Sequence, residues 1–127
     1  MNAEEQPDPW AKIVGPCYTS KSMARALGWT EADVIDAGSD LRLLMLHTED
    51  DVFLFPAFQL QRGEVVEGLQ KVLLVLQAGV DDPWAWAQWL NVELPDEHTP
   101  RNITLLYEGR LEEALRDARH DASAWSS

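Results

Sequence analysis

Residues 18–38, YTSKSMARALGWTEADVIDAG, contain the signals that decide the fold of the N-terminal half of the chain. Thr19 precedes a run with one apolar face at helical spacing and Gly28 follows it, which is the usual order of a helix N-cap and C-cap. Thr30 then precedes a second short run, which Gly38 closes. The segment therefore predicts two short helices joined by a tight turn, as in a helix-turn-helix.

Downstream of the helix pair, two strand-like runs (41–46 and 52–55) flank the polar turn HTEDD and predict a β-hairpin. Pro56 is expected to end the second strand, because proline has no N–H to donate to a ladder. A helix pair followed by a hairpin is the element order of a winged helix. Apolar residues from Val65 to Leu76 then recur at helical spacing and predict a long amphipathic helix that covers one face of this lobe.

The C-terminal part reads as a separate helical lobe. Asp82-Pro83 and Thr99-Pro100 each place proline at a helix start, and a last amphipathic run begins at Leu111. The predicted fold class is α+β, mainly helical, with a winged-helix-like N-terminal lobe bearing one β-hairpin and a small C-terminal helical lobe. The predicted divisions are a tail (1–9), the N-terminal lobe with the long helix (10–80), the helical lobe (81–122) and a second tail (123–127).

Charge is the most unusual property of the composition. The 127 residues include 10 Lys and Arg against 22 Asp and Glu, giving a net charge of −12. Nucleic acids and anionic membranes are both bound largely through Lys and Arg, so this balance disfavours both partners. A basic protein surface would instead be attracted. The composition therefore favours a protein partner.

Chemistry-bearing residues form no recognisable catalytic or metal-binding motif. His47, His98 and His120 are scattered, and Cys17 has neither ligand spacing nor a nucleophile signature around it. The sequence therefore predicts no enzyme activity, no metal and no cofactor. With a single cysteine, no secretory signal pattern and no long apolar run, the expected location is the cytoplasm.

Tryptophans are the other notable feature. Trp29, Trp84 and Trp89 fall in the apolar periodicity and are expected in the core. Trp86 and Trp125 fit that periodicity less well and are candidates for an exposed binding surface, where tryptophan is enriched.

The predicted helix-turn-helix is electrostatically unsuited to DNA. Its second helix carries acids and no base, and the hairpin tip is acidic as well; these acids are Glu31, Asp33 and Asp36 in the helix and Glu49, Asp50 and Asp51 at the tip. Only Lys21, Arg25 and Arg42 are available nearby to contact phosphates. The favoured interpretation is a winged scaffold that does not bind DNA by itself, while DNA contact as a dimer or complex stays open.

Residues 89–115, WLNVELPDEHTPRNITLLYEGRLEEAL, resemble the toxin-binding domain of the Xre/MbcA/ParS group of bacterial antitoxins. The resemblance is carried by Trp89, Leu90, Pro95, Thr99, Pro100, Leu106, Gly109 and Ala114. Asp96, Glu97 and His98 stand where that family usually has a glycine-containing loop. Residues 18–60 resemble a divergent MerR- or excisionase-type winged helix, which agrees with the domain order of the group.

The resemblance implies an antitoxin that binds and neutralises a cognate toxin, usually a RES-type enzyme or a ParT-like transferase, and dimers are common in the group. The expected partner-binding residues are Trp86, Asp96, Glu97, His98, Arg101 and Trp125. Two alternatives remain: a DNA-binding transcriptional autoregulator, which would use Lys21, Arg25 and Arg42, and an acidic adaptor or DNA mimic.

Overall fold

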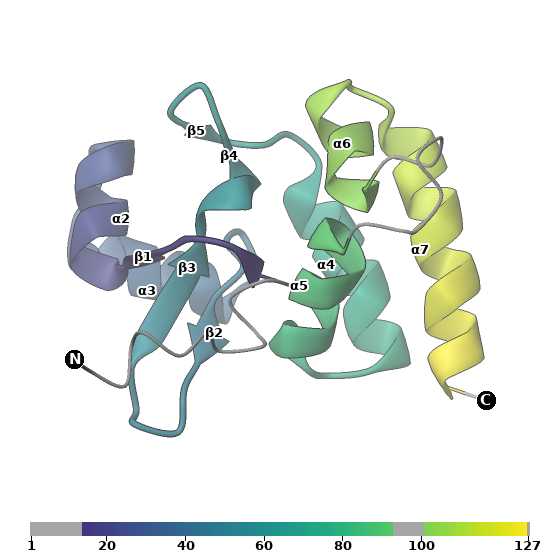
Figure 1. Cartoon of the computed structure of the whole chain (residues 1–127), viewed down its shortest axis with the longest axis horizontal. Coiled ribbons are helices and arrows are strands. Elements are labelled where there is room, and N and C mark those ends of the chain that lie inside the picture. The colour runs from purple at the N-terminus through teal and green to yellow at the C-terminus, as the bar shows by residue number, and fades with distance from the viewer. Residues whose placement is uncertain (1–13, 93–100, 127) are drawn as a thin grey trace, which may run out of the picture.

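A computed structural model of the chain describes residues 14–92 and 101–126, and these form a mainly helical α+β fold (Figure 1). The N-terminal elements gather at one side around a small sheet, and the helices α4–α7 form the other side. This agrees with the predicted fold class. None of the helices within the described residues is long and apolar enough to cross a membrane.

The two predicted N-terminal helices are α2 (Ser20–Leu27) and α3 (Glu31–Ser39). Thr19 caps α2 through a reciprocal pair: its Oγ1 accepts from the backbone N–H of Ser22 at 3.1 Å, and the Ser22 Oγ accepts from the Thr19 N–H at 2.9 Å. Gly28 ends α2 in the left-handed conformation (φ 74°). Thr30 caps α3 by accepting from the Asp33 N–H at 3.1 Å. The N-cap signals and Gly28 were therefore predicted correctly, whereas Gly38, expected to close the second helix, lies inside α3, which ends at Ser39.

The hairpin is present but shorter than expected. Its strands are β2 (Leu46–His47) and β3 (Phe53–Pro56), so the prediction of a strand from residue 41 is wrong except at its last residue. Leu41 has a positive φ of 67°, which breaks an extended run. A further strand, β1 (Cys17–Thr19), pairs antiparallel with β3 and gives the sheet order β1-β3-β2. No pattern in the sequence predicted β1.

A second small hairpin separates the sheet from the long helix. After the 3₁₀ turn η2 (Ala57–Gln59), β4 (Leu60–Gln61) pairs with β5 (Glu64–Val65). Arg62 and Gly63 both have positive φ, as the two central residues of a type I′ turn require. The long helix α4 therefore begins at Leu69 and ends at Gly79, and its predicted start at Val65 is wrong.

The remaining helices are α5 (Pro83–Asn91), α6 (Asn102–Tyr107) and α7 (Leu111–Ser126). Asp82 caps α5 by accepting from the Trp84 N–H at 3.1 Å, as the Asp-Pro signal predicted. Helix α7 continues through Ser126, so the residues expected to form a C-terminal tail are helical up to that point.

Helices α4 and α7 make the most extensive contact between elements in the described chain. They run in the same direction, since Gly68 lies against Leu111 and Gly79 lies against Ala122. A Cβ on Gly79 would stand 2.6 Å from the backbone of Ala122, so glycine allows this close approach. The long helix, expected to cover the N-terminal lobe, therefore packs mainly in the C-terminal half.

Two apolar clusters form the core. One lies under α2, α3 and the sheet and includes Met23, Val34 and Phe55, while the larger one lies among α4, α5, α6 and α7. Polar contacts join the two halves: the Tyr107 hydroxyl donates to the Phe58 carbonyl, and Gln61 Nε2 donates to the Tyr107 carbonyl at 3.0 Å. These contacts fix α6 against the segment that leads out of the sheet.

Candidate protein-binding surfaces

The predicted loop of partner-binding residues is only partly described. Asp96, Glu97 and His98 lie outside the described residues. Arg101, at the N-cap of α6, donates from Nη1 to Asn91 Oδ1 at 2.7 Å. This hydrogen bond joins the start of α6 to the end of α5, so the Arg101 guanidinium is held in place by a contact within the chain.

Trp86 is not a surface residue, and its prediction as a partner contact is wrong. Its side chain is 1% exposed, and its indole N–H donates to the Val80 carbonyl at 2.7 Å. The neighbouring Ala87, Trp89 and Leu90 are buried as well, so α5 is covered on more than one face. A single apolar stripe at helical spacing underestimates the buried positions of such a helix.

Trp125 is exposed, as expected, near the C-terminal end of α7. Its side chain is 39% exposed and borders a hollow of about 320 Å³ that is also lined by Ala85, Gln88 and Trp89. The Trp89 indole N–H donates to Asp121 Oδ2 at 2.7 Å, which joins α5 to α7 behind this hollow. The hollow is thus a surface with two tryptophans, lined by residues of α5 and α7.

The other tryptophans divide between core and surface. Trp89 is buried, as predicted, and Trp84 is half-buried, with its indole N–H donating to the His47 carbonyl at 3.3 Å. Trp29 is 37% exposed, so its prediction as a core residue is wrong. It follows the Gly28 cap in the turn between α2 and α3, where the left-handed residue changes the direction of the chain and ends the helical register.

The exposed face of α3 is acidic. Glu31, Asp33 and Asp36 are all exposed, and α3 contains no Lys or Arg. The turn between β2 and β3 exposes three further acids, Glu49, Asp50 and Asp51. These are the two elements that would meet the DNA groove and backbone in a winged helix, and their carboxylates would repel phosphates.

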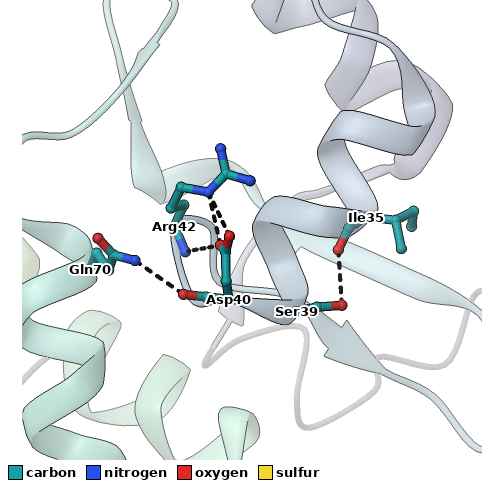
Figure 2. A network of polar contacts seen from close by, with 5 residues as sticks. All are labelled: Ile35, Ser39, Asp40, Arg42 and Gln70. Atoms are coloured by element: carbon teal, nitrogen blue, oxygen red, sulfur yellow. Dashed lines mark hydrogen bonds and ion pairs between the residues drawn. The ribbon is translucent and has the colours of Figure 1, made fainter.

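Of the three candidate DNA-contacting cations, Arg42 is held within the chain (Figure 2). Its Nε donates to both carboxylate oxygens of Asp40 at 2.9 Å, and its backbone N–H donates to Asp40 Oδ1 at 3.2 Å. These hydrogen bonds hold the pKa of the Asp40 carboxyl below its usual range, and Asp40 in turn raises the pKa of Arg42. Gln70 Nε2 donates to the Asp40 carbonyl at 3.1 Å, linking this turn to α4.

Lys21 and Arg25 differ from Arg42. Both are exposed on α2, four residues apart, and neither forms a salt bridge with a described carboxylate. They are the two candidate cations whose charge is not already engaged at the surface.

A groove that the sequence did not predict lies between α4 and α7. It has a volume of about 550 Å³, and its lining includes Leu74, Ala78, Arg119 and Ser123. Leu74 is 49% exposed. The available signal was the position of Leu74, which falls outside the buried stripe of α4 formed by Leu69, Val72, Leu73 and Leu76.

Within residues 14–92 and 101–126, no group of three or more His, Cys, Asp or Glu side chains is arranged to hold a metal ion. Cys17 is half-buried, and burial raises the pKa of its thiol, which disfavours the reactive thiolate.

No protein-family model matches the chain, and no curated protein matches it. One solved structure, described as "NMR structure of Rv2175c", is similar in fold, with a TM-score of 0.68 and 20% sequence identity over 91% of this chain and 84% of that one. At this identity the likeness concerns the fold alone. The chain therefore shares a mainly helical α+β architecture with that protein over most of both lengths.

Proposed function

We propose that this protein is an antitoxin-like binding protein whose C-terminal half contacts and neutralises a partner enzyme of the RES or ParT-like type. The observation that carries the proposal is the exposed indole of Trp125 beside the hollow formed with Ala85, Gln88 and Trp89. Exposed aromatic side chains at the edge of a preformed hollow are frequent hot spots of protein binding. The resemblance of residues 89–115 to a toxin-binding domain supports the same half of the chain.

Electrostatics supports a protein partner over DNA alone. The net charge is −12, and acids occupy both α3 and the turn between β2 and β3. A basic partner surface would be attracted to this chain, whereas duplex DNA would be repelled where it must approach closely.

The experiment is co-purification with the product of the neighbouring gene, followed by affinity measurement with two matched variants. Trp125→Ser should weaken binding by about tenfold or more, as loss of a tryptophan hot spot does. Trp29→Ser is the control, because Trp29 is exposed to a similar extent but lies in the turn between α2 and α3. If no enzyme co-purifies, or if both variants bind as the wild type does, the proposal fails.

A DNA-binding autoregulator is the second candidate, favoured by two observations. The order β1-α2-α3-β2-β3, with sheet order β1-β3-β2, agrees with that of a winged helix, and Lys21 and Arg25 are exposed on α2. Gel shifts against the gene's own promoter, with and without the partner, test this candidate. Lys21→Glu with Arg25→Glu should abolish any shift, while Arg116→Glu on α7 should not. A gel shift that persists in the double variant would show that Lys21 and Arg25 are not needed for DNA binding.

A competition experiment with duplex DNA distinguishes the acidic-adaptor alternative from the antitoxin proposal. An adaptor that occupies a nucleic-acid groove of its partner would be displaced by added duplex, and its affinity would fall steeply with salt. Binding through the Trp125 hollow should instead be insensitive to added duplex.

A further inference from the structure

The groove between α4 and α7 is apolar at its floor and open to solvent. Its lining includes the small residues Ala78, Gly79 and Ala122, with Gly79 packed against the backbone of Ala122, and Leu74 is 49% exposed. Small side chains at a helix crossing leave room for a third backbone to come close. This groove shares no lining residue with the Trp125 hollow, so it is a separate surface.

The charge beside the groove is opposite to that of the molecule as a whole. Arg119 lines the groove, and Lys71 is exposed on α4 one turn before Leu74. Neither side chain forms a salt bridge with a described carboxylate. Helix α4 contains no acid, and Lys71 is its only charged residue. In a chain of net charge −12, exposed apolar and unpaired cationic side chains therefore coincide on this face.

We infer that the α4–α7 groove binds an amphipathic helix of a partner protein whose apolar face is flanked by Asp or Glu. The partner's apolar side chains would cover Leu74 and the small-residue floor, as in helix-in-groove recognition. Its carboxylates would meet Lys71 and Arg119, which form no salt bridge with a described carboxylate. The charge of the groove thus selects acidic partner helices and rejects basic ones.

A second copy of this chain is a poorer occupant. In a two-fold contact the same surface patch lies on both sides, so the cations Lys71 and Arg119 of one groove would face those of the other. Two chains of net charge −12 also repel one another.

The test uses the full chain and two fluorescent helical peptides of about 16 residues, long enough to hold four turns. Both carry leucine at helical spacing, one with flanking glutamates and the other with lysines in their place. Fluorescence anisotropy should show saturable binding of the glutamate peptide and at least about tenfold weaker binding of the lysine peptide.

Variants locate the site and its charge preference. Leu74→Ser and Arg119→Glu should each lower the affinity for the glutamate peptide by about tenfold. Arg119→Glu should also raise the affinity for the lysine peptide. The matched controls are Val52→Ser, another exposed apolar side chain, and Arg62→Glu, another exposed cation, and neither should change binding.

Three results would overturn the inference: no saturable binding of the glutamate peptide, equal affinity for both peptides, or equal losses in the control variants. Sedimentation equilibrium of the chain alone adds a fourth. A dimer that Leu74→Ser dissociates would show that a second copy occupies the groove.

Discussion

At the scale of single residues, Gln59 is a buried polar side chain that joins two segments of the N-terminal half. It is fully buried, and its amide joins the backbone N–H and carbonyl of Leu44 (2.8 and 3.0 Å) and the carbonyl of Pro56 (3.0 Å). It therefore satisfies three backbone groups, two of them in the segment just before β2 and one at the last residue of β3.

Replacing Gln59 with leucine should lower the free energy of unfolding by roughly 3 kcal/mol, because buried backbone groups lose their partners. Gln70→Ala is the control: it removes one exposed hydrogen bond, to the Asp40 carbonyl, and should change stability by no more than about 0.5 kcal/mol. Urea denaturation measures both. Equal effects would contradict the role given to Gln59.

The Asp40–Arg42 pair makes a second prediction at this scale. Hydrogen bonds from Arg42 lower the pKa of Asp40, so the interaction stabilises the folded chain at neutral pH and is lost as the pH falls through that lowered pKa. In an NMR titration, Arg42→Gln should raise the pKa of Asp40 toward the ordinary aspartate value. Arg110→Gln should leave Asp40 unchanged and raise the pKa of Glu113 instead.

At the scale of secondary structure, α4 presents two adjacent leucines to opposite environments. Leu73 is fully buried, whereas Leu74 is 49% exposed. Leu73→Ala should cost roughly 2–5 kcal/mol through lost burial and the cavity it leaves, and Leu74→Ala should cost less than about 1 kcal/mol. Thermal or urea unfolding of the two variants tests which face of α4 is buried. Similar losses of stability in both variants would contradict this orientation of the helix.

Local signals explain which elements could be predicted from the sequence. Thr19, Thr30 and Asp82-Pro83 act on backbone groups within three residues, so they mark helix starts wherever the rest of the chain lies. Strand β1 has three residues and exists because Cys17–Thr19 pairs with β3, which follows much later in the chain. No local pattern in three residues predicts such a partner.

The candidate site was harder to predict than the fold for a related reason. Trp86 is buried because α5 is enclosed by neighbours on several sides, a property of tertiary packing that periodicity along one helix does not contain. The exposure of Trp125 was predicted correctly because its neighbours in the sequence are polar, although it lies in α7 and not in a tail. The α4–α7 groove arises between helices that are distant in sequence, so only their packing reveals it.

At the scale of the whole molecule, the charge imbalance should be visible in stability. With a net charge of −12, repulsion among exposed carboxylates opposes the compact state at low ionic strength. Raising NaCl from about 10 to about 300 mM at neutral pH should therefore raise the melting temperature, because the Debye length shortens.

Neutralising the acids between β2 and β3, by Glu49→Gln, Asp50→Asn and Asp51→Asn together, should reduce that dependence on salt. A melting temperature that falls with added salt would mean that the attraction within ion pairs contributes more to stability than the repulsion among carboxylates takes away.

The parallel packing of α4 on α7 has a consequence for synthesis on the ribosome. Helix α7, which covers the apolar stripe of α4, is the third helix after it, so a nascent chain that ends after α5 or α6 carries that stripe without its main neighbour. Premature stop codons before α7 should accordingly yield products that chaperones retain and proteases remove, even though every residue of the first sheet has already been translated.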